Sequence, residues 1–505
     1  MKDKILFWID TNLAEFGIAK FLEQHNIFDL FAIYDINYPL NQSFKNQNIV
    51  NFQKEWFFWE HVLEPKKDID IKYLKEFEDK YQIQLWNLVY TERIFYKYNP
   101  FYKFKKNEIL SILEQECKFF EYVLNETKPN FLIIKITDFH RNHLLSEMCK
   151  KKGIKVLTLV PTRIGNRATI VSDVNKFDET WKTRLEEEIG TGEDFNIEKY
   201  LKSHDRAKQT KKIVSGGINF PLNKKIKVAY KWITETFDEK YKKSYDRKGV
   251  SRSKAGYIFV KNILKSKIRR SFIDKHFTRE IIEEKFIFFP LQVVPERTVS
   301  LDAPYYSNQI SVITNIAKSI PIDYKLYVKE HFSMEARNWR SISEYKQIME
   351  LPNIRIIHPS VSAEKIIKKS KLTITISSTA GMEAAYYKKP TIIFADTIYS
   401  KLSSITRINN YEHLRDEIKN SLARKNDYLD LEKFLKIMDK NTFEFDAFDL
   451  YSRFTRKFHN EGFLQASQIE MNELEEFLIE QKKILEKCVE EFLKVIIKYK
   501  KLKNN

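Results

Sequence analysis

The sequence is short of the residues that mark several common classes of protein. It has three cysteines in 505 residues, and Cys117, Cys149 and Cys488 are widely separated with no CxxC pair. This pattern argues against a disulfide framework and against a cysteine-based zinc site. No apolar run approaches the roughly 20 residues that a membrane-spanning helix needs, and Asp10 stands where a signal peptide would still be apolar. We therefore expect a cytoplasmic protein.

Motifs for metal and nucleic-acid binding are also scarce. The only compact acidic pair, Asp68 and Asp70, lies in a charged run between predicted elements, where a surface position explains it better than a metal site. No RNP-like, zinc-finger or KH-type signature is present, so nucleic acid is not an expected partner. We expect no bound metal.

What the sequence has in abundance is apolar residues and lysine. Hydrophobic residues make up 43% and aromatic residues 14% of the chain, which is enough for two or more packed cores. Between Asp205 and Arg279 there are 22 Lys and Arg against 6 Asp and Glu, while the whole chain has a net charge of +18. This basic block interleaves cations with aromatic and aliphatic residues. One interpretation is a surface that attracts an anionic membrane or a phosphate-rich acceptor. The other is a solvated, lysine-rich insert between domains.

Hydrophobic periodicity predicts two α/β domains on either side of that block. In residues 1–200, KILFWID, FDLFAIYDI, PNFLIIKITDF and KVLTLV read as strands separated by helices, with a mostly helical stretch from Asp70 to Lys128. Residues 201–283 form the basic linker. In residues 284–425, FIFFPLQ, YKLYVKEH, IRIIHP, LTITISS and PTIIFAD are the strand candidates. Residues 426–505 are predicted to be helical, ending in an amphipathic helix that either packs on the protein or contacts a membrane or partner.

A segment of small residues in the second domain raises the question of a ligand. The run TITISSTAGMEAAYY places Ser377, Ser378, Thr379 and Gly381 between a strand and a helix, with Glu383 one turn further on. At such a turn the free N–H groups and the helix dipole favour an anion, and small residues let a phosphate approach. Glu383 could accept hydrogen bonds from a sugar hydroxyl or cap its own helix.

Polar residues follow two other strands of the same domain. Gln292 and Glu296 come after FIFFP, and Lys329 and His331 end YKLYVKEH. The carboxyl ends of parallel strands meet at one edge of a sheet, so these side chains are expected to converge. A lysine or histidine there could stabilise the charge of a leaving phosphate. The alternatives are a surface ion pair for Lys329 and a satisfied strand-end histidine for His331.

Taken together, these segments resemble a known family. The series FPLQ, PE, YYSNQI, SIPIDYKLYVKEH, YKQIMELPNIRIIHPS and TITISSTAGMEAAYYKKPTIIFADTIY is similar to the donor half of bacterial capsule and surface-polysaccharide glycosyltransferases. The group includes enzymes that use CMP-Kdo. The resemblance covers roughly Phe286 to Arg407 and implies a GT-B-like α/β fold, with two Rossmann-like domains that face a cleft.

The resemblance also implies roles for individual residues. Glu296 matches the family's glutamate after the first strand and is a candidate catalytic residue. His331 matches the histidine of a His-Pro motif, although Phe332 replaces the proline here. Ser377, Thr379, Gly381 and Glu383 match the small-residue loop and the glutamate that follows it. Transfer in this architecture needs no metal and no cofactor besides the nucleotide sugar as co-substrate.

The first domain should supply the acceptor side of the reaction. An acceptor hydroxyl needs a general base, and the candidates at strand ends are Asp10, Asp138 and His140. Asp10 and Asp138 could equally cap the helices that follow them.

Two arginines in RIGNR could meet an anionic acceptor or the donor phosphate. These are Arg163 and Arg167, and a salt bridge to Asp173 or a neighbour is the alternative.

The function we predict is transfer of a sugar from a nucleotide-sugar donor, with CMP-Kdo as one candidate, to a growing capsule, lipopolysaccharide or related glycan. The acceptor would be lipid-linked or a polysaccharide, and contact with the anionic inner membrane would be peripheral. One alternative is a CDP-polyol phosphotransferase of the teichoic-acid type. Another is a non-catalytic protein that binds RNA or acidic polysaccharide through its basic surface.

Overall fold

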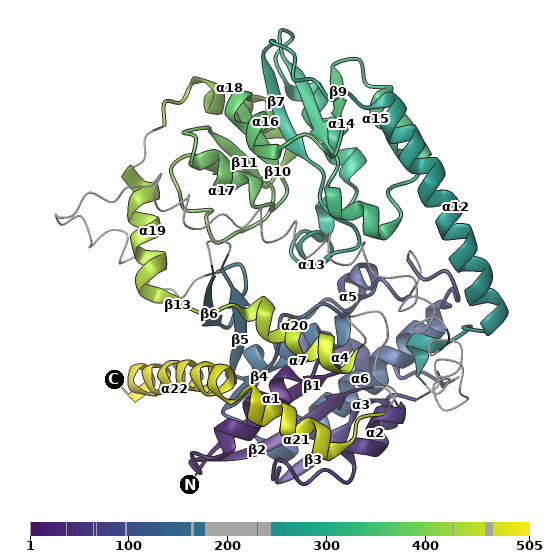
Figure 1. Cartoon of the computed structure of the whole chain (residues 1–505), viewed down its shortest axis with the longest axis vertical. Coiled ribbons are helices and arrows are strands. Elements are labelled where there is room, and N and C mark those ends of the chain that lie inside the picture. Colours follow the sequence, from purple (N-terminus) through teal and green to yellow (C-terminus); the bar gives the residue numbers. More distant parts are fainter. Residues whose placement is uncertain are drawn as a thin grey trace. The chain divides into compact units, whose positions relative to one another are not determined.

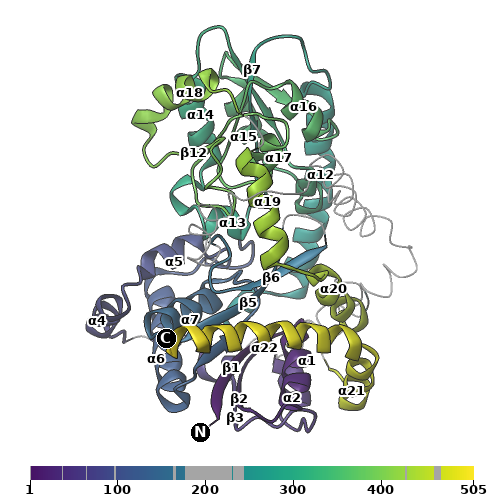
Figure 2. The same ribbon diagram turned by 90° about the vertical axis from the view of Figure 1, so that its left-hand side faces the viewer.

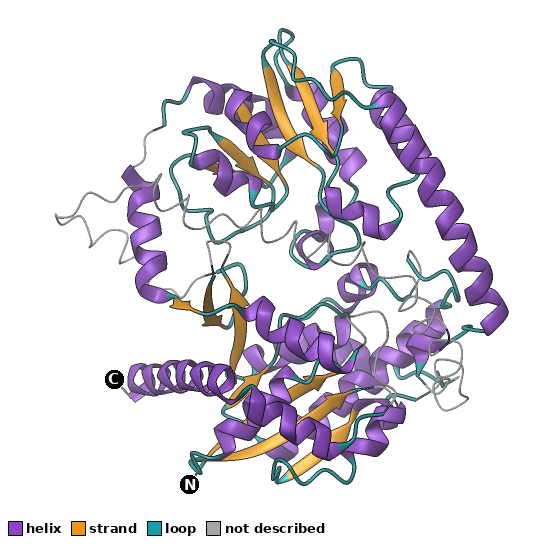
Figure 3. Cartoon of the chain, in the orientation of Figure 1, coloured by secondary structure: helices purple, strands orange, loops and turns teal. Residues whose placement is uncertain are grey.

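The chain divides into two compact units, each built on its own β-sheet (Figures 1 and 3). The computed structural model describes residues 2–36, 38–63, 65–66, 68–95, 98–162, 166–176, 230, 244–426, 429–459 and 468–504. Unit 1 comprises Met1–Val174, His204–Ala255 and Thr442–Asn505. Unit 2 comprises Asn175–Ser203 and Gly256–Asn441.

Unit 1 is a seven-stranded α/β unit. Its strands are β1 (Asp3–Asp10), β2 (Phe28–Asp35), β3 (Lys54–Phe57), β4 (Phe131–Ile133), β5 (Lys155–Pro161), β6 (Arg167–Val171) and β13 (Phe443–Glu444), in the order β13-β6-β5-β4-β1-β2-β3. All neighbours are parallel except at β6, which is antiparallel to both β5 and β13.

The helices of unit 1 cover both faces of that sheet. They are α1 (Ala14–Glu23), α2 (Tyr38–Phe44), α3 (Phe58–His61), α4 (Ile71–Tyr81), α5 (Leu85–Thr91), α6 (Lys106–Thr127) and α7 (His140–Lys151). Alternate residues of β1 enter different cores, because side chains along a strand point to opposite faces. Phe7 joins one core, and Leu6 and Trp8 join the other. The continuous apolar run of β1 is therefore the pattern of a strand buried on both faces.

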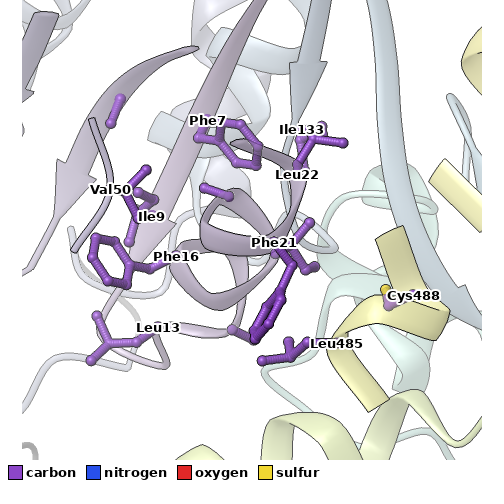
Figure 4. Close-up of a cluster of buried hydrophobic side chains, with 14 of the residues drawn as sticks. Phe7, Ile9, Leu13, Phe16, Phe21, Leu22, Val50, Ile133, Leu485 and Cys488 are labelled. Atoms are coloured by element: carbon purple, nitrogen blue, oxygen red, sulfur yellow. The ribbon is translucent and has the colours of Figure 1, made fainter. Parts of the chain in front are cut away.

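The C-terminal helices complete the first of those cores. They are α20 (Ala447–Phe458), α21 (Met471–Glu480) and α22 (Lys482–Asn504). Figure 2 shows α22 as one long helix that passes beside α1, and Figure 4 shows Leu485 and Cys488 of α22 on the side of α1 that carries Phe21. A Cβ added to Gly17 of α1 would lie 3.0 Å from the Phe454 ring. Glycine thus lets α1 and the C-terminal helices approach closely.

Unit 2 has a six-stranded, entirely parallel sheet. Its strands are β7 (Phe286–Pro290), β8 (Lys325–Lys329), β9 (Ile354–Ile357), β10 (Leu372–Thr375), β11 (Thr391–Ile393) and β12 (Ile405–Arg407), in the order β12-β11-β10-β7-β8-β9.

Helices and 3₁₀ turns connect these strands. They are α13 (Arg297–Ser300), η3 (Pro304–Tyr306), α14 (Gln309–Ser319), η4 (Phe332–Arg337), α15 (Ile342–Met349), α16 (Ala363–Lys369), α17 (Ala380–Ala385), η5 (Tyr411–His413), α18 (Leu414–Ala423) and α19 (Leu429–Asn441). Strand and helix therefore alternate from β7 to β11, as a doubly wound sheet requires, whereas no helix lies among the described residues between β11 and β12.

The described part of the basic linker is mostly one helix. After the 3₁₀ turn η2 (Tyr245–Arg247), α12 runs from Arg252 to His276, and the boundary between the units falls within it, at Ala255 and Gly256. Its apolar residues lie on more than one side of the helix instead of forming a single face. Residues 201–229 and 231–243 of the predicted linker lie outside the described residues.

The predicted α/β, GT-B-like class is confirmed by two Rossmann-like units with parallel strands. Two points differ in detail. The C-terminal helices, expected as a separate segment, are divided between the units at Asn441, and the single long helix expected at the end is interrupted at Gln481. That the two domains face a cleft stays a prediction. Across the described residues, no helix combines the length and apolar character needed to cross a membrane.

Candidate functional site

The site in unit 2 lies where the strand order of its sheet reverses. β7 is flanked by β8 on one side and by β10 on the other, so the crevice between the carboxyl ends of β7 and β10 is the topological switch point where ligands bind in such sheets. The Nε2 of Gln292, after β7, lies 3.5 Å from the Oγ of Ser377, after β10. Two of the predicted donor-binding residues thus meet across the crevice.

Gln292 is held in place through hydrogen bonds to its backbone N–H and carbonyl groups. Its N–H donates to Oε1 of Gln309 at 2.8 Å, Nε2 of Gln309 donates back to its carbonyl at 3.0 Å, and Arg340 donates to the same carbonyl. On the other strand, Ser377 Oγ donates to the carbonyl of Thr298 at 3.1 Å. These bonds fix the crevice before any ligand arrives.

The small-residue loop is more closed than we expected. The N–H of Ser378 donates to Thr375 Oγ1, the N–H of Ala380 to Ser378 Oγ, and the N–H of Gly381 to the Ser378 carbonyl. The prediction that these N–H groups point outward unpaired is therefore wrong for these three. Thr379, the residue before α17, and Ser378 are half-buried and border the crevice.

Gly381 is required by packing and not by access for a phosphate. It is buried, and a Cβ at this position would lie 2.8 Å from the hydroxyl and 2.9 Å from Cε2 of Tyr399. The Tyr399 hydroxyl donates to the carbonyl of Ser378. Close approach to Tyr399 is thus enough to require glycine at this position, and a role of Gly381 in donor binding stays a prediction. Glu383 lies half-buried in the first turn of α17.

At the end of β8 the structure has a buried ion pair and not the surface pair that we considered as the alternative for Lys329. Lys329 is 8% exposed, and its Nζ donates to the Glu330 carbonyl at 3.3 Å. The fully buried Glu330 carboxylate pairs instead with Arg340 at 2.8 Å and accepts from the Tyr345 hydroxyl at 2.8 Å. Burial and the Glu330 charge raise the pKa of Tyr345.

His331 stands beside this network as a neutral ring. Burial, together with the cations Lys329, Arg340 and Arg337, lowers the pKa of His331 to about 4. Its Nδ1 accepts the N–H of Ser333 at 3.2 Å, so the neutral ring carries its proton on Nε2. At neutral pH His331 can therefore donate one hydrogen bond to an anion, while Lys329 supplies positive charge.

Glu296 is half-buried and precedes the short helix α13. The next residue, Arg297, forms an ion pair with Asp302 at 2.9 Å that is largely enclosed. This pair fixes the loop that carries Glu296 toward the carboxyl end of β7.

Unit 1 has a corresponding switch point between β1 and β4. Asp10 ends β1, and Lys135 follows β4 and forms an ion pair with the Asp10 carboxylate. Asp10 also accepts the N–H of Asn12 at 2.9 Å in the turn before α1, but it does not cap that helix, whose N-cap is Leu13 with no side-chain capping bond. Burial opposes a charged Lys135, but attraction to Asp10 outweighs it and the pKa of Lys135 is raised.

A second carboxylate is buried just behind this pair. Glu15 of α1 is 2% exposed, and its Oε1 accepts the Tyr451 hydroxyl at 3.0 Å. Its Oε2 has no hydrogen-bond partner in the part of the chain that the structure describes. Burial, assisted by the negative charge of Asp10, raises the pKa of Glu15 to about 7.

Strand β2, next to β1, also ends in a carboxylate that is paired with a cation. Asp35 of β2 is the register partner of Asp10, and it bonds Nε of Arg141 at 2.8 Å. Burial raises the pKa of Asp35, and Arg141 offsets this only in part. The Arg141 guanidinium lies over the Phe139 ring at 4.6 Å, with Nη1 unpaired among the described residues. Two carboxylates, Asp10 and Asp35, therefore lie side by side at the carboxyl edge of β1 and β2, and each is paired with one cation.

The three candidates for the general base differ in their surroundings. His140 is enclosed, with Nδ1 2.6 Å from Glu92 and Nε2 2.8 Å from Glu116. Burial alone would lower the pKa of His140, but the two carboxylates outweigh it and raise the pKa to about 9. A buried imidazolium has no free lone pair, so this geometry argues against His140 as a base. Asp138 is half-buried, and its carboxylate has no hydrogen bond to any described residue.

The two arginines of RIGNR have different outcomes. Arg167 donates from Nε to Thr442 Oγ1 and from Nη2 to the Thr442 carbonyl, both at 2.7 Å. It therefore ties β6 to the segment that enters β13, and contact of Arg167 with an anionic acceptor or a phosphate stays a prediction. Arg163 lies outside the described residues.

The sequence analysis did not identify several residues that lie at these two sheet edges. Asp35, Arg141 and Arg340 are buried and Lys135 is partly buried. Lys135 and Arg141 pair with residues far away in the sequence, whereas Arg340 pairs with Glu330 ten residues before it. Arg340 precedes a recognisable capping box of Ser341 and Glu344, but no local signal links it to Glu330. For Asp35, its position at the end of a strand beside Asp10 was the available signal.

Comparison with known proteins addresses the second half of the chain. Residues 195–430 match the family described as "Capsule polysaccharide biosynthesis protein". The predicted family resemblance is confirmed. Protein FixF of Sinorhizobium fredii (strain NBRC 101917 / NGR234) is 25% identical over 164 residues, which is 32% of this chain and 39% of that protein. The chain thus matches well under two thirds of the length of this relative.

Two solved structures illustrate the more distant similarities. A UDP-GlcNAc 2-epimerase from Methanocaldococcus jannaschii is 13% identical, with a TM-score of 0.25, over 86% of this chain and 99% of that chain. The Thermosulfurimonas dismutans KpsC, beta Kdo 2,7 transferase, is 13% identical, with a TM-score of 0.32, over 63% of this chain and 79% of that chain. The fold assignment rests on the two sheets described above, one parallel and one mostly parallel, and not on these two similarities.

Proposed function

We propose that this protein is a glycosyltransferase of capsule, lipopolysaccharide or related surface-glycan biosynthesis. The observation that carries the proposal is the family match over residues 195–430, which encloses the carboxyl edge of the unit 2 sheet with Gln292, Lys329, His331 and Ser377. A nucleotide sugar would bind at this edge, and CMP-Kdo is the donor that the family resemblance favours. The acceptor is a lipid-linked or polysaccharide glycan at the inner face of the cytoplasmic membrane.

The proposed chemistry uses residues of both units. Lys329 and the Nε2–H of His331 would stabilise the negative charge that develops on the departing nucleotide phosphate, which is the help a metal ion gives in other transferases. The acceptor oxygen forms a bond to the anomeric carbon as the bond from that carbon to the phosphate oxygen breaks, and the nucleotide leaves with the bonding electrons. A carboxylate takes the hydroxyl proton.

Asp138 is the remaining base whose carboxylate is less engaged. Its carboxylate is half-buried and without a hydrogen bond to the described residues, whereas Asp10 is 8% exposed and already paired with Lys135. We therefore assign the proton transfer to Asp138 and the fixing of the acceptor edge to Asp10 and Lys135.

Titration calorimetry of the purified protein with CMP, CDP, UDP and GDP tests this proposal. We expect selective binding of one nucleotide, and a loss of about tenfold in affinity, or about 1.4 kcal/mol, in His331→Ala. His413→Ala is the matched control, because His413 is exposed on η5 in the same unit. It should bind like the wild type.

The identity of the nucleotide decides between the alternatives. CMP would support a Kdo-like donor, and UDP or GDP would keep the transferase but exclude that donor. CDP would favour the polyol-phosphate reaction. Binding of none of the four, or equal binding by wild type and His331→Ala, would remove the proposed donor site.

A further inference from the structure

Helix α12 exposes an unusual number of large apolar side chains. Six of them are at least 43% exposed, and Tyr257 and Phe259 reach 63%. The six are Tyr257, Phe259, Val260, Ile263, Leu264 and Ile268. Single exposed apolar residues are common on soluble proteins, but a group of this size on one helix marks a surface that another body covers.

Four of these side chains form a stripe, and the other two, Phe259 and Ile263, lie on another side of the helix. Tyr257, Val260, Leu264 and Ile268 follow one another at intervals of three, four and four residues, so they lie on the same side of the helix. Lysines border the stripe. Seen along the helix axis, Lys267 points in nearly the same direction as Val260, on one edge of the stripe. Lys261 points in nearly the same direction as Ile268, on the other edge. Nζ of Lys261 lies 5.1 Å from the Tyr257 ring centre.

The end of α12 is fixed to unit 2, so the stripe is held in a defined position. Ile273 is fully buried in the unit 2 core. Arg269 donates to the carbonyls of Asn338 and Trp339 at 2.8 and 2.9 Å, and Arg270 pairs with Glu335 at 2.6 Å.

The charge on α12 identifies the kind of surface it would meet. Arg252–His276 contains eight Lys and Arg residues and one acid, Asp274. Asp274 is itself paired with Arg270 and Arg279. Pairing α12 with a second copy of itself would bring like charges together, which disfavours a symmetric dimer. Nucleic acid would satisfy the cations but would leave the aliphatic side chains of the stripe in water.

We propose that α12 docks on an anionic lipid bilayer. The stripe of Tyr257, Val260, Leu264 and Ile268 enters the interface between headgroups and acyl chains, and the bordering lysines reach up to the lipid phosphates. This inference deepens the membrane location in the proposed function and rests on that part of it. It does not depend on the transfer reaction, so vesicle binding and nucleotide binding can fail separately.

Vesicle flotation with the full chain tests the proposal. The protein should float with phosphatidylcholine vesicles that contain phosphatidylglycerol, and much less with phosphatidylcholine alone. Leu264→Ser combined with Ile268→Ser should lower the partition coefficient about tenfold or more, because two buried aliphatic side chains are lost. Ile322→Ser is the matched control, since Ile322 is fully exposed elsewhere in unit 2. It should leave flotation unchanged.

Two double charge-reversal variants test the electrostatic contribution to vesicle binding. Lys261→Glu combined with Lys265→Glu should abolish the preference for phosphatidylglycerol. Lys318→Glu combined with Lys419→Glu carries the same charge change on exposed residues of α14 and α18 and should keep it. Thermal melting and nucleotide titration of each variant show that unit 2 is still folded.

A fluorescent label gives a direct readout of insertion. The three native cysteines are buried and burial raises their pKa, so Leu264→Cys can be labelled selectively with an environment-sensitive dye. A blue shift with anionic vesicles supports the proposal. Absence of flotation at low salt, equal flotation of both Leu264→Ser/Ile268→Ser and Ile322→Ser, or self-association abolished by the stripe variant would overturn it. So would RNA binding that is lost in the stripe variant while vesicle binding is absent.

Discussion

At the scale of single residues, one glycine shows how packing and ligand binding can be confused. Gly381 stands in the small-residue loop where a phosphate approach was expected, but the space above its Cα is filled by Tyr399 and Thr391. The sequence pattern of small residues after a strand is the same in both cases. Only the position of Tyr399, brought back from beyond β11, distinguishes them.

Gly381→Ala should therefore destabilise unit 2. The new Cβ would lie 2.8 Å from the Tyr399 hydroxyl and 3.1 Å from Thr391 Cγ2, and we expect a loss of about 1–3 kcal/mol in the free energy of unfolding. Urea denaturation followed by circular dichroism measures it. The control is Gly256→Ala in α12, where a Cβ meets nothing within 4 Å, and it should be neutral or stabilising by about 0.5–1 kcal/mol. Equal stability of wild type and Gly381→Ala would show that the loop has room to adjust.

At the scale of secondary-structure elements, periodicity predicted the strands that carry the site. β1, β2, β4, β5, β7, β8, β9, β10 and β11 were expected because each is a short apolar run followed by turn residues. Four strands were missed. β3, β6, β12 and β13 are short and lie at or near the sheet edges, where burial on one side only leaves a weak pattern. The residues at the strand ends were predictable for the same reason as the strands, since parallel topology brings them to one edge.

The charge pairs that fix those edges were not predictable. His140 joins three elements, because Glu92 follows α5, Glu116 lies on α6, and the Tyr245 hydroxyl of η2 donates to Glu116 at 3.0 Å. Nothing in the sequence near His140 indicates either carboxylate. His140 was interpreted as a catalytic candidate from its position after a strand, and the same position serves here to join α5, α6 and α7.

This cluster predicts a specific pH dependence of stability. The pKa of His140 is raised in the folded state to about 9, above its unfolded value near 6.5. Its contribution is therefore complete below pH 6.5 and is lost as the pH rises through 9. His140→Asn leaves two buried carboxylates without their cation and should cost on the order of 3–5 kcal/mol at pH 6.5. That penalty should shrink by about 3 kcal/mol above pH 9.

The measurement is urea denaturation of wild type and His140→Asn across this pH range, with His25→Gln as control. His25 is exposed after α1, and its replacement should leave stability unchanged at every pH. A penalty for His140→Asn that does not change between pH 6.5 and 10 would mean that the ring is neutral in the folded protein and that packing alone accounts for its effect.

At the scale of the whole molecule, residues from opposite ends of the chain share one hydrophobic core. Phe454, Phe477 and Leu485 come from the last hundred residues, yet they pack with Phe16 and Phe21 in the first core of unit 1. Unit 2 has separate cores on the two sides of its own sheet. A chain that starts and ends in unit 1 must form contacts of long sequence separation before that unit is complete, which is expected to make unit 1 the slower to fold.

Separate cores imply separate unfolding transitions, and mutations can assign each segment to one of them. Phe16→Leu on α1 and Phe454→Leu on α20 should lower the same calorimetric transition, by about 2–4 °C for each kcal/mol lost. Ile374→Val on β10, fully buried in unit 2, should lower the other transition and leave the first in place. If Phe454→Leu instead moved the transition that Ile374→Val moves, the C-terminal helices would draw their stability from unit 2. A single transition lowered by all three would mean that the two units unfold together, although each has its own sheet and cores.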